Sequence, residues 1–297
     1  MTIKEILSSS IIELRKTGTE TANLDARVLL EHVLEKDSCD IISHPEMPLT
    51  NSQYSRFRSL IRRRKKGEPV AYLTGHKEFY GYDFFVNKNV LIPRPETELL
   101  VEQAIKYVKC QMSNVKNKEK ISIIDIGTGS GCIIISMVLE AKKLMPNLLI
   151  TDFCASDISK KALYVARKNA KLHQINKQIR FFHSDLFSNP RMPKKYDAII
   201  ANLPYVPSDS KSYKLEAKSL RHEPQDAIFA KDNGAEIIKK FLNQARSRIN
   251  NDGLILIEID PRNARELQHY AKNMFNKCKV DLIKDLSQKK RELIILT

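Results

Sequence analysis

A strand-like run that ends in a glycine-rich turn constrains the fold of this chain more than any other segment. The sequence Ile121-Ser-Ile-Ile-Asp-Ile126 is dominated by isoleucine, which is typical of a strand buried in a parallel sheet. Gly127-Thr128-Gly129-Ser130-Gly131 follows it, and the apolar segment Cys132 to Leu144 then reads as a helix. Glycines at such a turn let the backbone approach a ligand at the N-terminus of the helix. The segment therefore predicts one strand–turn–helix unit of an α/β sheet, with a ligand at the turn.

The spacing of the glycines argues against two common phosphate-binding loops. Gly-x-Gly-x-Gly differs from the Gly-x-Gly-x-x-Gly of dinucleotide-binding folds, and no Walker lysine follows it. The next apolar run, Leu148 to Ser156, ends at Asp157, and an acid in this position is placed to bind ribose hydroxyls. Asp157 could also be the N-cap of a helix expected from Ser159 to His173, and the sequence leaves both roles open.

A polar tetrapeptide follows another apolar run, Tyr196 to Ala201. It is Asn202-Leu203-Pro204-Tyr205, about 75 residues after the glycine turn. The Asn202 side-chain oxygen and the Leu203 carbonyl can accept hydrogen bonds from the two N–H bonds of a planar amine or amide. Tyr205 offers a ring face on which such a group could stack. Asn-x-Pro also begins ordinary loops, so the tetrapeptide gains weight from its distance to the turn.

Together these segments resemble the class I S-adenosylmethionine (SAM) methyltransferases, and the tetrapeptide is similar to the Asn-Pro-Pro-Tyr signature of enzymes that methylate planar nitrogens. The block Leu91-Ile-Pro-Arg-Pro-Glu-Thr-Glu98 is similar to a block of the HemK-type release-factor glutamine N5-methyltransferases. Gly67 to Gly75, Glu78-Phe-Tyr and Arg221-His-Glu-Pro224 also resemble that family. The resemblance covers nearly the whole chain. It implies methyl transfer from SAM to the side-chain amide nitrogen (N5) of the glutamine in the Gly-Gly-Gln motif of peptide chain release factors.

The resemblance also implies roles for individual residues. Asn202 is the expected catalytic residue, and no general base is expected. Leu203 stands where the family usually has proline, which puts efficiency in doubt more than reaction type. Asp185 is either an adenine-binding residue or an ordinary turn residue. The residues expected to bind SAM are Gly127, Thr128, Gly129, Ser130, Gly131, Asp157, Asp185, Leu186 and Asn202, those expected to contact substrate are Asn202, Leu203, Pro204, Tyr205 and Glu223, and no metal site is expected.

The order of periodic segments predicts an α/β fold, a class I methyltransferase doubly wound seven-stranded sheet with a small N-terminal helical domain. We expect a helical substrate-docking domain over 1–73, a β-hairpin linker over 74–95 and a SAM-dependent methyltransferase domain over 96–297. Residues 206–231 lack clean periodicity and are interpreted as a lid that contacts the substrate. The expected strands lie near 121–126, 149–155, 179–184, 196–201, 253–259, 279–284 and 291–296.

Composition indicates where the protein acts and what kind of partner it binds. With no apolar stretch near about 18 residues and no signal-peptide pattern, a cytoplasmic protein without a membrane partner is expected. The five cysteines include no Cys-x-x-Cys pair, which indicates buried free thiols. The net charge of +15 favours an anionic partner. The run Arg62-Arg-Arg-Lys-Lys66, in contrast, reads best as the solvated last turn of a helix.

Peptide chain release factors are the expected partners, met free or near the ribosome, and no stable nucleic-acid partner is expected. The main alternative is a nucleic-acid methyltransferase acting on adenine N6 or guanine N2, which would use the same geometry on a flipped base. The positive charge favours it, whereas the block ending at Glu98 argues against it. A ribosomal-protein glutamine methyltransferase and an inactive SAM-binding scaffold are the remaining alternatives.

Overall fold

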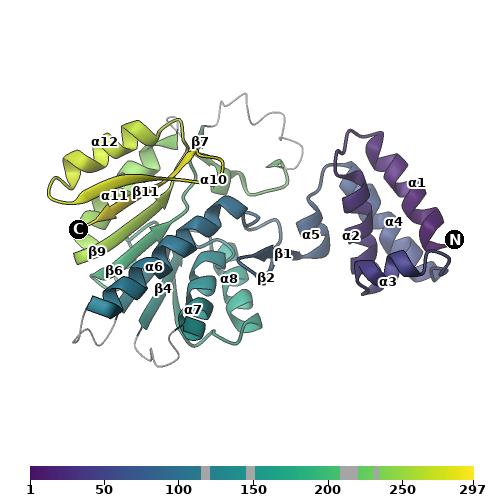
Figure 1. Cartoon of the computed structure of the whole chain (residues 1–297), viewed down its shortest axis with the longest axis horizontal. Coiled ribbons are helices and arrows are strands. Elements are labelled where there is room, and N and C mark those ends of the chain that lie inside the picture. Colours follow the sequence, from purple (N-terminus) through teal and green to yellow (C-terminus); the bar gives the residue numbers. More distant parts are fainter. Residues whose placement is uncertain (115–120, 145–150, 208–219, 231–233) are drawn as a thin grey trace. The chain divides into compact units, whose positions relative to one another are not determined.

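The computed structural model describes residues 1–114, 121–144, 151–207, 220–230 and 234–297. The chain divides into two compact units, which are taken in turn (Figure 1). The smaller unit consists of 1–76 together with 211–222, and the larger unit consists of 77–210 together with 223–297. The domain boundaries predicted from the sequence remain predictions.

The smaller unit is a group of helices around one apolar core. Its first helix begins with a capping box, in which Thr2 and Glu5 each accept a hydrogen bond from the backbone N–H of the other. The helical character expected of this region is confirmed, although its two short helices show no periodicity in the sequence. The five helices are α1 (Ile3–Arg15), α2 (Ala22–Leu34), α3 (Ser38–Ser43), α4 (Asn51–Lys65) and α5 (Val70–Thr74).

The basic run at the end of α4 is largely paired within this unit. Arg64 donates to Asp25 over 2.6 Å, and only 17% and 8% of their side chains are exposed. Lys65 lies 3.1 Å from Glu13, and Arg63 pairs with Glu68. The run ends a helix, as predicted, but the prediction that it is solvated was wrong for Arg64, whose side chain is mostly buried against Asp25.

The larger unit contains the predicted seven-stranded sheet, in the order β10-β11-β9-β6-β3-β4-β5, so the fold class is confirmed. Strands β5, β4, β3, β6 and β9 run parallel, and β11 pairs antiparallel with both β9 and β10. The strands are β3 (Ile121–Ile126), β4 (Thr151–Asp157), β5 (Ile179–His183), β6 (Tyr196–Ala201), β9 (Ile249–Glu258), β10 (Lys279–Lys284) and β11 (Lys290–Leu296).

Helices cover both faces of this sheet (Figure 1). One buried cluster joins the sheet to α6 (Glu98–Asn114), α7 (Cys132–Leu144) and α8 (Lys160–Leu172). The other joins it to α11 (Glu236–Arg248) and α12 (Ala264–Met274). This arrangement makes β3 buried on both faces, as its isoleucine-rich sequence indicates.

The expected aromatic hairpin is present as β1 (His76–Phe79) and β2 (Tyr82–Phe85). The rings of Phe79 and Phe84 meet edge to face at 6.1 Å, and both side chains are buried. Core packing therefore accounts for these two aromatic residues.

The region interpreted as a lid is described only in part. It contains β7 (Val206–Pro207), α10 (Gln225–Ile228) and β8 (Phe229–Ala230), and β7 pairs parallel with β8. Residues 208–219 and 231–233 lie outside the described residues, and with them half of the region interpreted as a lid.

The short 3₁₀ helix η1 (Pro95–Thr97) leads into α6.

The cysteines are all free, as expected. Cys132 and Cys154 are buried, but the prediction of burial was wrong for Cys39 and Cys110. Cys39 lies on the short α3, and Cys110 lies on the solvent side of α6, although apolar neighbours in the sequence suggested a core position. In the part of the chain that the structure describes, none of the helices has the length and apolar character needed to cross a membrane, and no metal-binding group of three or more His, Cys, Asp or Glu side chains occurs.

Candidate active site

A cavity of about 750 Å³ opens where the parallel strands end. It lies beside β3, at the point where the sheet order turns from β4 on one side to β6 on the other. Ligands of open α/β sheets bind at such a switch point, and the volume is that of a cofactor site. Among the described residues, the cavity is lined by the predicted Gly127, Thr128, Gly129, Ser130, Asp157, Asp185, Leu186, Asn202, Leu203 and Pro204, but not by Gly131, Tyr205 or Glu223.

The three glycines of the turn have different tasks. All have positive φ, at 75° for Gly127, 55° for Gly129 and 83° for Gly131. A Cβ atom at Gly129 would meet no heavy atom within 4 Å, so this position faces open space beside the cavity. A Cβ atom at Gly131 would lie 2.9 Å from Ile135 Cδ1 and 3.2 Å from Ala166 Cβ. Gly131 therefore permits α7 to pack closely against α8.

Asp157 holds the turn from the neighbouring strand. Its Oδ2 accepts the Gly129 N–H over 2.9 Å, and its Oδ1 accepts the Ser159 N–H over 2.8 Å. Ser159, which accepts from Ala162 N over 3.2 Å, is the N-cap of α8, so the alternative of Asp157 as the N-cap was wrong. Burial raises the pKa of Asp157, and the two backbone hydrogen bonds lower it. Each oxygen keeps a second lone pair that can accept from a ligand hydroxyl.

A second acid lies behind the turn and was missed from the sequence. Asp125 is fully buried on β3 and accepts from Thr128 Oγ1 over 2.6 Å. Burial raises the pKa of this carboxyl to about 7, and the nearby Asp157 contributes to that rise. The available signal was an acid inside an isoleucine-rich strand, since buried carboxyls of this kind gather at functional sites.

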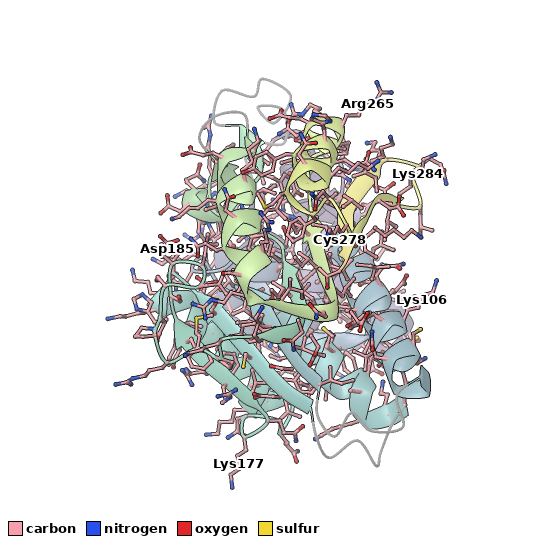
Figure 2. The ribbon with its side chains drawn as sticks, turned by 90° about the vertical axis from the view of Figure 1, so that its left-hand side faces the viewer. Lys106, Lys177, Asp185, Arg265, Cys278 and Lys284 are labelled. Atoms are coloured by element: carbon pink, nitrogen blue, oxygen red, sulfur yellow. The ribbon has the colours of Figure 1, made fainter. Side chains whose placement is uncertain are left out.

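Asp185 and Leu186 form the rim of the cavity after β5. Asp185 Oδ2 accepts from Lys240 Nζ over 2.8 Å, and about half of each side chain is exposed. Figure 2 shows Asp185 at the surface of the larger unit. Leu186 is buried and has a left-handed φ of 50°. The backbone turns at Leu186, and Asp185 both turns the chain and faces the cavity.

Asn202 is held by a buried hydrogen-bond network. Its Nδ2 donates to Thr97 Oγ1 over 3.0 Å and to Glu258 Oε2 over 2.9 Å. Thr97 Oγ1 donates to the same Glu258 oxygen over 2.6 Å, and Tyr205 Oη donates to Glu258 Oε1 over 2.7 Å. Only 3% of Thr97 and 2% of Glu258 are exposed. Burial raises the pKa of Glu258, and the hydrogen bonds from Thr97 and Tyr205 lower it.

Glu258 was missed from the sequence, although it ends the apolar strand β9. Thr97 lies within the block that resembles the HemK-type family, but nothing in its local sequence indicates its partner. The contact joins residues 161 positions apart, so only the folded sheet brings them together.

Leu203 packs the tetrapeptide against the glycine turn. Its side chain is 5% exposed, and its Cδ2 atom lies 3.1 Å from the position that a Cβ atom at Gly127 would take. The leucine therefore fills space beside the turn at a position where the family usually has proline.

Arg94 and Glu223 connect two segments near the cavity. Glu223, whose side chain is 1% exposed, accepts from Arg94 over 2.7 Å and from Ile92 N over 3.0 Å. Arg94 lines the cavity and anchors the segment before η1. Glu223 is engaged by the protein itself, and contact with a substrate remains a prediction.

Comparison with known proteins agrees with this architecture. Residues 5–75 match the PrmC N-terminal domain, and residues 108–225 match the methyltransferase small domain. The catalytic domain of hMettl16, in complex with MAT2A 3′UTR hairpin 1, shares the fold with a TM-score of 0.54 at 14% identity, over 85% of this chain and 83% of that one.

Curated relatives are more similar in sequence. A release factor glutamine methyltransferase from Coxiella burnetii is 38% identical over 259 residues, covering 87% of this chain and 86% of the relative. The corresponding protein from Rhodopirellula baltica is 34% identical over 98% of this chain and 95% of its own length. A bifunctional methyltransferase from Rickettsia typhi is 35% identical over 86% of this chain, which spans 50% of that longer protein. By this similarity and by its methyltransferase fold, the chain belongs to the release factor glutamine methyltransferase family.

Proposed function

We propose that this enzyme transfers a methyl group from SAM to the side-chain amide nitrogen of the glutamine in the Gly-Gly-Gln motif of peptide chain release factors. The observation that carries the proposal is Asn202 at the cavity, with its amide nitrogen hydrogen-bonded to Thr97 and Glu258. Its Oδ1 is left to accept from a substrate NH2 group. The names of the related proteins supply the identity of the substrate.

The glycine turn, Asp157 and Asp185 are the residues that would hold SAM. The open space at Gly129 would admit the cofactor close to the backbone, and Asp157 has free lone pairs for ribose hydroxyls. Asp185 lies across the cavity rim, where the family holds the adenine. When bound, SAM supplies an electrophilic methyl group on a sulfonium.

The contribution of the protein itself is to orient the substrate amide. The lone pair of a glutamine amide is delocalised, so a fixed geometry gives much of the acceleration. Asn202 Oδ1 and the Leu203 carbonyl would accept the two N–H bonds of the glutamine and aim the nitrogen at the methyl group. The same acceptors stabilise the positive charge that grows on nitrogen. As the carbon–nitrogen bond forms and the carbon–sulfur bond breaks, the nitrogen becomes acidic and loses one proton to water.

The test is an incubation with methyl-labelled SAM and purified release factor, rRNA or DNA. Label is expected on one glutamine of the release factor, and Gln→Glu in its Gly-Gly-Gln motif should end labelling. A carboxylate lacks both N–H donors and would be repelled by the acceptors at Asn202 and Leu203. Label in rRNA or DNA, with the release factor unmodified, would replace this proposal by a nucleic-acid methyltransferase.

A further inference from the structure

The carboxylate of Glu258 is buried at the end of β9 and receives hydrogen bonds from three side chains. The donors are Thr97 from η1, Asn202 from the end of β6, and Tyr205 from the segment after it. Resting on the proposed function, we infer that Glu258 is the positioning residue that fixes Asn202 with its oxygen toward the substrate. It would thereby restrict the site to acceptors that carry an NH2 group.

The direction of each hydrogen bond follows from the groups themselves. The Asn202 atom that lies 2.9 Å from Glu258 Oε2 and 3.0 Å from Thr97 Oγ1 is the amide nitrogen Nδ2, which donates to both oxygens. The Thr97 hydroxyl has a single proton, which it gives to Glu258, so Thr97 accepts from Asn202. The amide nitrogen of Asn202 therefore faces the protein, and its oxygen is left for the cavity.

A flipped Asn202 amide would be disfavoured at both contacts. Its oxygen would lie against Glu258 Oε2 and Thr97 Oγ1, the two oxygens to which the amide nitrogen now donates, and these hydrogen bonds would be lost. The flipped group would also present N–H donors to the cavity, against the N–H bonds of the substrate. The network therefore sets the hydrogen-bonding polarity of the site.

This polarity predicts the substrate class more narrowly than the cavity shape does. A face with the Asn202 oxygen and the Leu203 carbonyl offers only acceptors. It complements a primary amide or an exocyclic amine, and it repels a carboxylate. A site built around buried polar groups discriminates strongly, because a mismatched substrate leaves those groups unpaired.

Glu292 offers a matched control. It lies directly opposite Glu258 in the β9–β11 register and is fully buried. Within the described part of the chain, neither of its carboxylate oxygens has a hydrogen-bond partner. Glu258→Gln and Glu292→Gln place the same amide at two paired, buried positions, and only the first of these side chains is hydrogen-bonded to Asn202.

The experiment measures turnover on release factor, the KM for release factor and the Kd of SAM by calorimetry. In Glu258→Gln the new amide would replace one acceptor by a donor and could not receive all three hydrogen bonds, so turnover should fall about 10-fold or more. The Kd of SAM should stay within about twofold, because no residue of the glycine turn takes part in these hydrogen bonds. Glu292→Gln should keep turnover within about twofold of the wild type.

A second pair keeps the inference testable if Glu258→Gln does not fold. Thr97→Val removes the hydroxyl at nearly constant shape, and we expect it to lower turnover several-fold. Thr97→Ser should recover that loss, because it restores the hydroxyl.

Three results would overturn the inference: near-wild-type turnover in Glu258→Gln, an equal loss in Glu292→Gln, or equal turnover in Thr97→Val and Thr97→Ser. A wild-type enzyme that does not label the release factor would instead show that the proposed function has failed.

Discussion

Four buried carboxyl groups differ in what they receive from their neighbours. Asp157 accepts two backbone N–H bonds, Glu258 accepts from three side chains, and Asp125 accepts from Thr128. Glu292 accepts none from the residues that the structure describes. Since a buried charge is costly unless it is hydrogen-bonded, Asp157 and Glu258 are better suited to carry a charge than Glu292 is.

Asn202→Ala is expected to lower turnover by about 10²-fold or more, because it removes one acceptor of the substrate N–H bonds. SAM affinity should change little. Asn243→Ala on α11 is the control, since that asparagine bonds Tyr270 over 2.9 Å at an exposed site. Steady-state kinetics of both variants decide the matter, and an Asn202→Ala enzyme with near-normal turnover would refute the orienting role.

Asp157→Asn is expected to weaken SAM binding by about 5- to 150-fold, which corresponds to about 1–3 kcal/mol for one unsatisfied buried group. The amide has one acceptor atom for the two backbone N–H bonds, so either Gly129 or Ser159 loses its partner. Ser159→Ala removes only the cap of α8 and should cost stability without this loss of affinity. Calorimetry with unchanged affinity in Asp157→Asn would remove the residue from the cofactor site.

At the scale of elements, the sequence predicts those helices and strands whose bounds are set by a local pattern of residues. The bounds of β3 and α7 match the prediction, because a run of branched residues and a glycine turn define them locally. The short helices α3, α5 and α10 were not predicted, because they are too short to show a helical periodicity. The hydrogen-bond partners of Asn202 were not predicted for another reason. They lie on η1 and β9, and no local sequence signal links these elements to Asn202.

The glycine turn yields a paired prediction. Gly131→Ala should destabilise the fold by about 1–3 kcal/mol, because its φ is positive and the new methyl would press on Ile135 and Ala166. Gly129→Ala should cost only about 1 kcal/mol, since its methyl would meet open space, but it should weaken SAM binding. Denaturant unfolding and calorimetry on both variants separate the effects, and equal stability losses would contradict this assignment.

Strand β11 contains a buried acid, Glu292, that lowers the stability of the folded protein. Burial raises the pKa of Glu292 from its ordinary 4.5 to about 9, so the folded protein keeps a proton that the unfolded chain releases. Stability should therefore fall as pH rises from about 5 to 9. Glu292→Leu is expected to remove this slope and to add about 1–3 kcal/mol to the free energy of unfolding near neutral pH. Denaturant titrations at pH 5, 7 and 9 test it, and a gain that does not grow with pH would disprove the protonation argument.

At the scale of the whole molecule, the net charge is +15. Figure 2 shows Lys106, Lys177, Arg265 and Lys284 projecting from separate parts of the larger unit. The densest basic run, at the end of α4, is largely used in ion pairs with Asp25, Glu13 and Glu68. A net charge of this size acts at long range on an anionic partner.

The KM for release factor is accordingly expected to rise with salt between about 50 and 300 mM, as screening shortens the reach of the surface charge. The Kd of SAM should hardly change, because its contacts are short and partly buried. Kinetics and calorimetry over one salt series give both quantities. A release-factor KM that is independent of salt would show that charge does not steer this encounter.

The place of β11 in the sheet has a consequence for how the protein is made. This strand follows all the others in the sequence, yet it lies between β9 and β10. While the chain emerges from the ribosome, the hydrogen-bonding edge of β9 is complete long before its partner exists, and β10 arrives with no strand to join. The edge of the strand that carries Glu258 is therefore covered only when the last strand of the sheet has been made. During synthesis the enzyme passes through a stage in which this edge is unpaired, and nascent-chain chaperones can protect it at that stage.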